Sequence, residues 1–305
     1  MTRAVVFAYH NVGRRCLAVL LAQGVDVPLV CTHRDDPNEN IWFQSVAGFA
    51  QLRAIRIATP SDANEPEFVT RVREIRPDFL FSFYYRNMLK APLLATAQRG
   101  ALNMHGSLLP KYRGRAPVNW AVINGERETG ATLHYMVEKP DAGDIVDQQA
   151  VPILPDDTAY DVFNKVTVAA EMVLDRSLPG LIDGIAQRRP QQLAQGSYFG
   201  GRTPEDGRID WRRPARVVHN LIRGVAPPYP GAFTEIRGCR LRVVRSLLVA
   251  ESGETVQPQL YTEGDGCLVR CGGGGIVRLL ELDLDGEPVN ALQIERVVGA
   301  LPIPL

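Results

Sequence analysis

Asn103 and His105 are the residues of this 305-residue chain whose types and spacing are best suited to chemistry. They stand two positions apart in the segment ALNMHGSLLPKYRGRAPVNW, residues 101–120. Side chains two apart on an extended strand point to the same face. An imidazole titrates near neutral pH and an amide donates hydrogen bonds, so the pair can accept a proton and steady a developing negative charge. The alternative is a polar pair that serves only the fold.

A turn-rich loop follows this pair directly. Gly106 and Pro110 keep the segment from continuing as a regular element, and the loop carries Tyr112, Arg113 and Arg115. Loops held on a rigid scaffold often carry function. The loop is therefore a candidate for function, and a solvated basic loop is the alternative.

To act on a ligand, Asn103 and His105 must lie on a strand that ends at the ligand-binding edge of a sheet. The pattern of the first half of the chain predicts such a strand. Apolar, β-branched runs alternate with segments of helical period. Such alternation predicts βαβ units and a parallel sheet, in which ligands bind at the carboxyl ends of the strands. The predicted strands are 3–9, 25–32, 55–58, 78–84 and 101–105, with an antiparallel strand at 129–137, and the helices are 14–23, 41–53, 65–75, 92–98 and 159–186.

Two local features of this half carry expectations of their own. Pro28 lies inside a predicted strand, which favours either a position at the edge of the sheet or the start of a strand. His10 and Asn11 follow the first strand, and we expect a turn there, with ligand contact and plain turn chemistry equally open. The turn holds only Gly13, so the dinucleotide-binding fingerprint is absent.

The composition changes near residue 200. A polar, turn-rich segment leads to a helix at 216–224, and short strands follow at 232–237, 240–249, 258–262, 267–270 and 276–282. This spacing is typical of a small barrel or sandwich. We therefore predict the α/β class. Residues 1–200 should form a Rossmann-like, mostly parallel sheet with helices on both faces, and residues 201–305 a helical connector and a small β-rich, OB-like barrel.

Composition and charge narrow the classes of partner. The net charge is +0 and the pI about 7.0, which gives no electrostatic reason to expect nucleic acid or an anionic membrane. The five cysteines are odd in number and lack zinc-site spacing, which favours a reduced, cytoplasmic protein without a metal. The N-terminus is typical of a first strand rather than a signal peptide, and no apolar stretch is long enough to span a membrane. The oligomeric state is left open.

Several separated motifs resemble the folate-dependent formyltransferases. They occur in the family's order over nearly the whole chain. Besides Asn103-x-His105, they are Gly130-x-Thr132 with His134, Asp141-Ala142-Gly143-Asp144-Ile145, Asp210-Trp211 and Tyr229-Pro230-Gly231-Ala232-Phe233. Tyr229 departs from the Trp that is usual in the family.

Within the family, four segments look most like the branch that acts on UDP-4-amino-4-deoxy-L-arabinose. They are VVFAYHNVG, FSFYYRNML, SLLPKYRGRAPVNW and RTPEDGRIDW. That branch serves lipid A modification and polymyxin resistance. Its enzyme often carries a fused dehydrogenase, and we expect a stand-alone formyltransferase here. The strands after residue 240 match poorly.

The resemblance implies transfer of a formyl group from N10-formyltetrahydrofolate, as co-substrate, to the sugar's 4-amino group. It implies that His105 accepts the proton, Asn103 stabilises the oxyanion and Asp141 orients the imidazolium. The residues expected to contact folate are Arg86, Asn87, Met88, Leu89, Val137 and Asp141, and those expected to contact the nucleotide sugar are Tyr112, Arg113 and Arg115.

Three alternatives stay open at this point. The acceptor can be another nucleotide-linked amino sugar. It can be methionyl-tRNA, although a polyanion requires a basic surface and the net charge is +0. The chain can also be a binding module without catalysis, against which Asn103, His105 and Asp141 speak. For His134, both a direct role and an ordinary place in a strand are possible.

Overall fold

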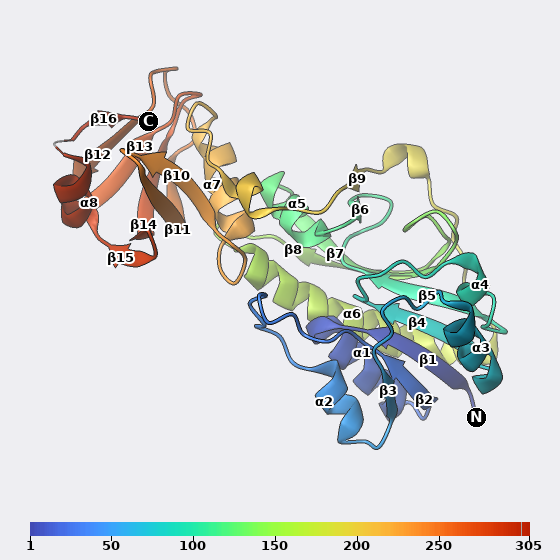
Figure 1. Cartoon of the computed structure of the whole chain (residues 1–305). Coiled ribbons are helices and arrows are strands. Elements are labelled where there is room, and N and C mark those ends of the chain that lie inside the picture. The colour runs from blue at the N-terminus through green and yellow to red at the C-terminus, as the bar shows by residue number, and fades with distance from the viewer. Residues whose placement is uncertain (300) are drawn as a thin grey trace. The chain divides into compact units, whose positions relative to one another are not determined.

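The computed structural model describes residues 1–299 and 301–305, which form two compact units (Figure 1). The first unit contains Met1–Pro117, Glu128–Val151 and Asn164–Phe199. The second contains Val118–Arg127, Pro152–Phe163 and Gly200–Leu305. The chain therefore leaves the first unit twice before residue 200. Division into domains at 1–200 and 201–305 stays a prediction.

The first unit is built on a seven-stranded sheet with the order β3-β2-β1-β4-β5-β7-β8. Strands β1 to β5 run parallel to one another and β7 runs antiparallel to β5, which confirms the predicted, mostly parallel sheet. The strands are β1 (Arg3–Ala8), β2 (Asp26–Cys31), β3 (Arg56–Ala58), β4 (Phe79–Phe83), β5 (Gly100–His105), β7 (Glu128–Tyr135) and β8 (Ile145–Pro152).

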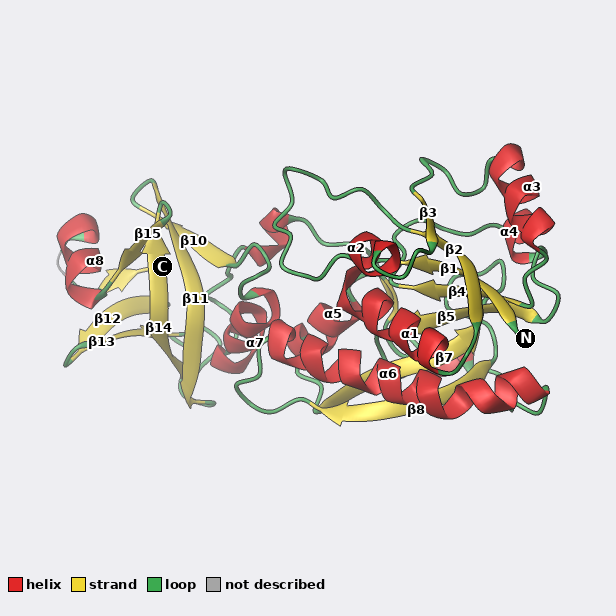
Figure 2. Ribbon diagram, turned by 90° about the horizontal axis from the view of Figure 1, so that it is seen from below, coloured by secondary structure: helices red, strands yellow, loops and turns green. Residues whose placement is uncertain are grey.

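Helices cover both faces of this sheet, as predicted. In Figure 2, α3 (Pro66–Ile75) and α4 (Ala91–Leu94) lie across the sheet from α1 (His10–Ala22) and α6 (Ala159–Asp183). Side chains of α3 and α4 share a buried apolar cluster with β1, β2 and β4. On the other face, Arg15 of α1 pairs with Glu171 of α6. The sheet is therefore buried on both faces, as parallel sheets usually are.

Short elements complete the first unit and lead out of it. The strand β6 (Arg113–Gly114) pairs in parallel with β9 (Tyr198–Phe199). The others are α2 (Val46–Gln51) and the 3-10 turn η1 (Leu193–Gln195), while α5 (Pro117–Ile123) and the 3-10 turn η2 (Pro204–Gly207) lie in segments of the second unit apart from Pro117. The β6–β9 pair fixes the loop that follows β5.

Two predicted helices of this unit are shorter than expected, and one predicted turn is assigned to a helix. The helix predicted at 41–53 is only α2, because Ser45 caps its start by accepting a hydrogen bond from the Gly48 amide at 3.1 Å. The helix predicted at 92–98 is only α4. The turn predicted at His10 is the first residue of α1. The helix begins directly after Tyr9, and its buried apolar residues begin at Val12.

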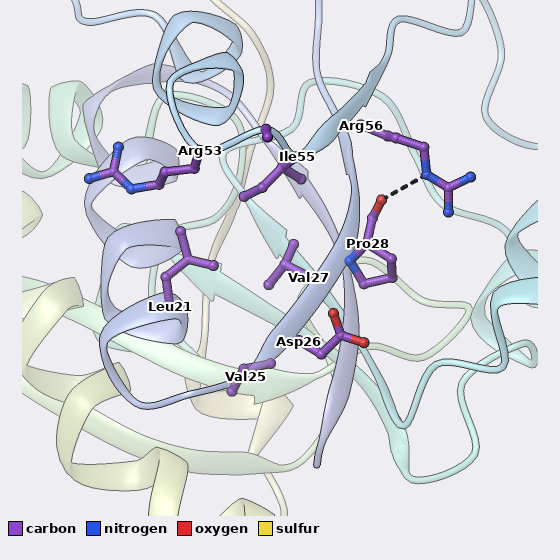
Figure 3. A pocket seen from close by; sticks show the side chains of 9 residues that line it. Leu21, Val25, Asp26, Val27, Pro28, Arg53, Ile55 and Arg56 are labelled. Atoms are coloured by element: carbon purple, nitrogen blue, oxygen red, sulfur yellow. Dashed lines mark hydrogen bonds between the residues drawn. The ribbon is translucent and has the colours of Figure 1, made fainter.

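Pro28 does not lie at the sheet edge, because β2 sits between β1 and β3. The β1 pairing is irregular between its Arg3 and Val5 partners, and the β3 pairing begins at Leu29. The missing N–H of Pro28 therefore falls where regular pairing is interrupted. Figure 3 shows its carbonyl accepting a hydrogen bond from Arg56 Nε at 3.3 Å, beside a surface hollow of about 420 Å³ at the amino ends of β2 and β3.

The second unit is a curled antiparallel sheet with the order β10-β11-β14-β13-β12-β16, to which β15 adds beside β14. Register shifts along the β11–β14 pair bend it, as bulges do. The elements are α7 (Ala215–Val225), β10 (Ala232–Ile236), β11 (Cys239–Ala250), β12 (Gln259–Glu263), β13 (Gly266–Arg270), β14 (Ile276–Leu284), β15 (Glu287–Val289), α8 (Ala291–Val298) and β16 (Ile303–Pro304).

This second unit confirms the predicted β-rich class as a half-barrel around α7. Val218 and Ile222 of α7 are buried in one apolar core with the strands. The prediction missed β15, α8 and β16. A signal for α8 was present, because Asn290 and Gln293 form a capping box at its start. No described helix is long and apolar enough to cross a membrane.

Candidate active site

Asn103 and His105 lie at the carboxyl end of β5, as predicted. The strand is flanked by β4 and β7, so the backbone on both sides is fixed by neighbours. The intervening Met104 is buried on the opposite face, and the His105 side chain is also buried. Period-two alternation therefore places the amide and the imidazole together on one face.

His134 stands directly opposite Asn103 in the antiparallel β5–β7 pair. Asn103 Nδ2 lies 3.1 Å from His134 Nε2. The other ring nitrogen, Nδ1, lies 2.8 Å from the Tyr135 carbonyl oxygen. A carbonyl only accepts, so Nδ1 is the donor and the neutral ring offers Nε2 as an acceptor. The Asn103 amide nitrogen can then donate to Nε2.

The His105 ring has the opposite arrangement. Its Nε2 lies 2.8 Å from the Tyr112 carbonyl oxygen, which makes Nε2 the donor. Its Nδ1 lies 3.6 Å from Asp141 Oδ1. The nitrogen that can take up a proton is therefore Nδ1, and the positive charge formed there would face a carboxylate.

Asp141 reaches this face from the loop between β7 and β8. Its Oδ1 lies 3.6 Å from His105 Nδ1 and 3.6 Å from His134 Nε2, and its Oδ2 accepts from the Gly114 amide at 2.9 Å. Burial alone would raise the pKa of this carboxyl, but His105, His134 and the Gly114 amide together hold that pKa well below its usual range. Asp141 is therefore a carboxylate at neutral pH.

The Asp141 loop is held by a residue far along the chain. Asp141 has φ +51, a left-handed conformation that aspartate adopts more readily than most residues with a side chain. Gln191 Nε2 donates to the carbonyls of Asp141 at 3.1 Å and Gly143 at 2.6 Å. Nothing in the local sequence signals that Gln191 supports this loop.

A second network holds the loop after β5. Thr132 Oγ1 donates to the Ser107 carbonyl at 2.6 Å and accepts from the Leu109 amide at 3.1 Å. Gln148 Nε2 donates to Thr132 Oγ1 and to the Leu109 carbonyl, each at 2.9 Å. Sequence reasoning missed Gln148. Thr132 lies two residues before His134 on the same strand, so strand alternation could have placed it on the catalytic face.

The residues expected to contact folate differ in how far they are exposed. Asn87 and Met88 are exposed, and Val137 is 47% exposed, so a ligand can reach all three. Leu89 is 7% exposed and belongs to the apolar cluster under α3 and α4. A ligand can therefore meet Leu89 only through its backbone.

Arg86 is tied to a neighbouring loop. Its guanidinium pairs with Glu39 at 2.7 and 2.5 Å and lies 4.7 Å from the centre of the Tyr9 ring. Its backbone amide donates to His33 Nε2 at 3.0 Å. A ligand that uses this guanidinium must therefore compete with Glu39.

The residues expected to contact the nucleotide sugar also differ from one another. Tyr112 is buried with its ring stacked on Phe199, so it offers the centre its carbonyl rather than its ring. Arg115 is exposed and lies 3.5 Å from the Arg86 carbonyl. Arg113 is 9% exposed, its Nε lacks a hydrogen-bond partner, and no described carboxylate pairs with it. A buried, unpaired guanidinium is suited to an anionic ligand.

These groups form a buried centre with one proton acceptor, one amide donor and one fixed carboxylate. The family comparison decides what kind of enzyme it is. Residues 11–178 match the family described as "Formyl transferase", and residues 202–297 match "Formyl transferase, C-terminal domain". The chain belongs to the formyl transferase family. It is a formyltransferase, and the resemblance seen in its motifs is confirmed.

Solved structures resemble this formyltransferase over most of its length. An N-formyltransferase from Helicobacter canadensis, crystallised with folinic acid and dTDP-3-aminofucose, is 21% identical with TM-score 0.72, over 92% of this chain and 99% of the other. WlaRD, a sugar 3N-formyltransferase crystallised with dTDP and 5-N-formyl-THF, is 22% identical with TM-score 0.73, over 92% and 97%. A 4-N formyltransferase from Francisella tularensis is 21% identical with TM-score 0.62, over 76% and 92%. At these identities the likeness supports the fold.

Proposed function

We propose that this formyltransferase moves a formyl group from N10-formyltetrahydrofolate to the 4-amino group of UDP-4-amino-4-deoxy-L-arabinose. The observation that carries the reaction is the Asp141 carboxylate, 3.6 Å from His105 Nδ1 on the face that also presents the Asn103 amide. The sugar rests on the sequence segments that resemble the aminoarabinose branch.

A folate as the formyl donor is supported by the comparisons and by local fit. Two similar formyltransferases were crystallised with folinic acid or 5-N-formyl-THF. In this chain Asn87, Met88 and Val137 are open to a ligand. When bound, the folate would supply the activated formyl group. We assign its contacts to these three residues, the backbone of Leu89, Arg86 after release from Glu39, and Asp141.

The centre would perform the acyl transfer as follows. The amine nitrogen forms a bond to the formyl carbon, and the electron pair of the carbonyl moves to its oxygen. The amine proton passes to His105 Nδ1, where Asp141 stabilises the charge. An Asn103 N–H donates to the oxygen that gains charge. When the tetrahedral species collapses, the electron pair on oxygen re-forms the carbonyl, the bond from the formyl carbon to N10 of the folate breaks, and the proton held at Nδ1 goes to that departing nitrogen.

A nucleotide diphosphate as part of the acceptor is supported by Arg113. This guanidinium is buried and has no carboxylate partner among the described residues, so an anion would remove an electrostatic penalty. Arg115, on the same loop, is exposed and can add a second contact. We assign the diphosphate to Arg113 and Arg115, and to Tyr112 a supporting role through its backbone.

The biological setting follows from the proposed sugar. Formylation of the aminoarabinose donor would serve lipid A modification and polymyxin resistance. Four of the cysteines are buried and all five are free thiols, which supports the cytoplasm as the place of the reaction.

A substrate panel tests this proposal. Purified protein is given N10-formyltetrahydrofolate and either the UDP-linked 4-amino sugar, a dTDP-linked 4-amino sugar or a dTDP-linked 3-amino sugar, and product is detected by mass. We expect kcat/KM to be highest for the UDP-linked 4-amino sugar. Preference for a dTDP-linked sugar would overturn the proposed acceptor but not the formyltransferase activity. A dTDP-linked amino sugar is the second candidate, because a similar enzyme was crystallised with dTDP-3-aminofucose.

A further inference from the structure

His134 is a buried polar residue that touches the proposed catalytic centre without a part in the reaction above. Its side chain is 1% exposed. Three groups face its ring: the Tyr135 carbonyl, the Asn103 amide and the Asp141 carboxylate. The His105 ring lies further away, with its centre 6.5 Å from the centre of the His134 ring.

We propose that His134 is a positioning residue that fixes the orientation of the Asn103 side-chain amide. The Tyr135 carbonyl, at 2.8 Å, holds the proton of the neutral ring on Nδ1. Nε2 is then only an acceptor, and at 3.1 Å it selects the NH2 end of the Asn103 amide over its oxygen. This inference rests on the proposed function, in which Asn103 donates to the reacting oxygen.

The Asn103 amide needs a neighbouring group that fixes its orientation, because the two ends of an amide have nearly the same shape. A half turn of the Asn103 amide would exchange its donor and acceptor ends at little steric cost. The oxygen would then meet the atom that gains negative charge, and an oxyanion donor would be lost. Loss of one such donor typically costs about 10²–10³ in kcat.

Asp141 cannot replace His134 in this task. Its Oδ1 lies 3.6 Å from His134 Nε2 and is already shared with His105 Nδ1, also at 3.6 Å. The other carboxylate oxygen is taken by the Gly114 amide. The His134 ring is held from behind by the Tyr135 carbonyl, so its acceptor points toward the Asn103 amide in a fixed direction.

A double-mutant cycle tests the coupling. His134→Leu should lower kcat about 10²–10³-fold, with each KM within about threefold and the melting temperature close to that of the wild type. His134→Gln offers an oxygen near the Nε2 position and should recover most of the loss. In the Asn103→Ala background, His134→Leu should have no further effect, because the group that it orients is gone. An equal loss in both backgrounds would overturn the proposal.

A readout that needs no turnover keeps this inference separate from the proposed function. The ¹⁵N resonances of the His134 imidazole report which ring nitrogen carries the proton. In the intact protein at neutral pH we expect Nδ1 to be protonated and Nε2 bare, and the Asn103 NH2 resonance to shift in His134→Leu. A proton on Nε2 would contradict the positioning role, whether or not any amino sugar is formylated. If no amino sugar is formylated while Nδ1 carries the proton, the proposed function alone is rejected.

Discussion

The first unit carries four of the chain's five histidines, in two pairs with opposite electrostatic surroundings. At β5 and β7, His105 and His134 each have a ring nitrogen 3.6 Å from Asp141 Oδ1. Near the ends of β1 and β2, His10 and His33 lie instead in the field of Arg86. Burial, and then the Arg86 charge, lowers the pKa of His10 to about 3 and also lowers the pKa of His33.

This difference shows how one residue type can serve two purposes along one sheet. A carboxylate compensates the charge of a proton taken up by a buried histidine; the proposed reaction uses this at His105, while His134 keeps its Nε2 as an acceptor for Asn103. A histidine beside a guanidinium stays neutral and can act as a packing group or acceptor. His33 does the latter by accepting from the Arg86 amide, and His10 packs its ring against Phe43 with the centres 4.0 Å apart.

The largest expected effect comes from removing a histidine beside the carboxylate, compared with removing one beside the guanidinium. His105→Ala should lower kcat by about 10²–10⁴, the range for loss of a general base. The matched change His33→Ala should leave kcat at saturating substrates within about threefold, since the neutral His33 ring carries no proton in the reaction. Steady-state kinetics measure both. Equal losses in the two variants would erase the distinction between the pairs.

Two mutations in the loop after β4, which contains Arg86, should distinguish an effect on folding from an effect on binding. Leu89→Ala removes a buried apolar side chain and should cost about 2–5 kcal/mol of unfolding free energy. Asn87→Ala changes an exposed residue, so stability should stay within about 0.5 kcal/mol while the KM for the folate rises. Denaturant melts and donor titrations measure the two effects. A higher KM for Leu89→Ala without destabilisation would mean that its side chain reaches the ligand.

Arg113 should behave as a binding group on the Asp141 side. Arg113→Ala should raise the KM for the nucleotide sugar about 10–100-fold, the equivalent of losing a charged hydrogen bond. The unliganded protein should be at least as stable as the wild type, because a buried unpaired charge is removed. Arg115→Ala, at an exposed position on the same loop, is the control and should change that KM less. A destabilised Arg113→Ala would point to a structural role.

The last effect concerns His10, and it depends on pH. Its folded pKa of about 3 lies below the ordinary value of 6.5, so between these values the unfolded chain binds a proton that the folded chain does not. Stability should therefore fall as pH falls from about 6.5 to about 3, by at most about 1.4 kcal/mol per pH unit from this group. His10→Asn cannot titrate and tolerates the left-handed backbone, φ +70, at this position. Unfolding curves at several pH values should show a shallower acid loss in the variant, and identical slopes would contradict the assignment.

Part of the centre could be predicted from sequence because it depends on local rules. Strand alternation places Asn103 and His105 on one face, and the order of strands places them at the carboxyl edge. Ser45 and Asn290 carried capping signals that fix the starts of α2 and α8 more closely than hydrophobic period did.

The rest depends on contacts between distant segments. The register that sets His134 opposite Asn103 arises from the pairing of β5 with β7, and a shift of one residue would turn His134 to the other face. The Tyr112 and Tyr135 carbonyls that fix the two tautomers belong to backbone, which carries no sequence signal. Gln191 holds the Asp141 loop across 50 residues, and Pro28 lies within the sheet only because its pairing is interrupted there.

The central claim is that the charge of Asp141 acts on the imidazole of His105, and Asp141→Asn tests it most directly. Asparagine keeps an oxygen that can accept from the Gly114 amide and tolerates the left-handed backbone, so the loop should stay in place. The measurement is the rate of formyl transfer in a single turnover with both substrates saturating. We predict a rate about 10²–10⁴ lower than in the wild type, with both substrates still bound. A wild-type rate in Asp141→Asn would contradict the account.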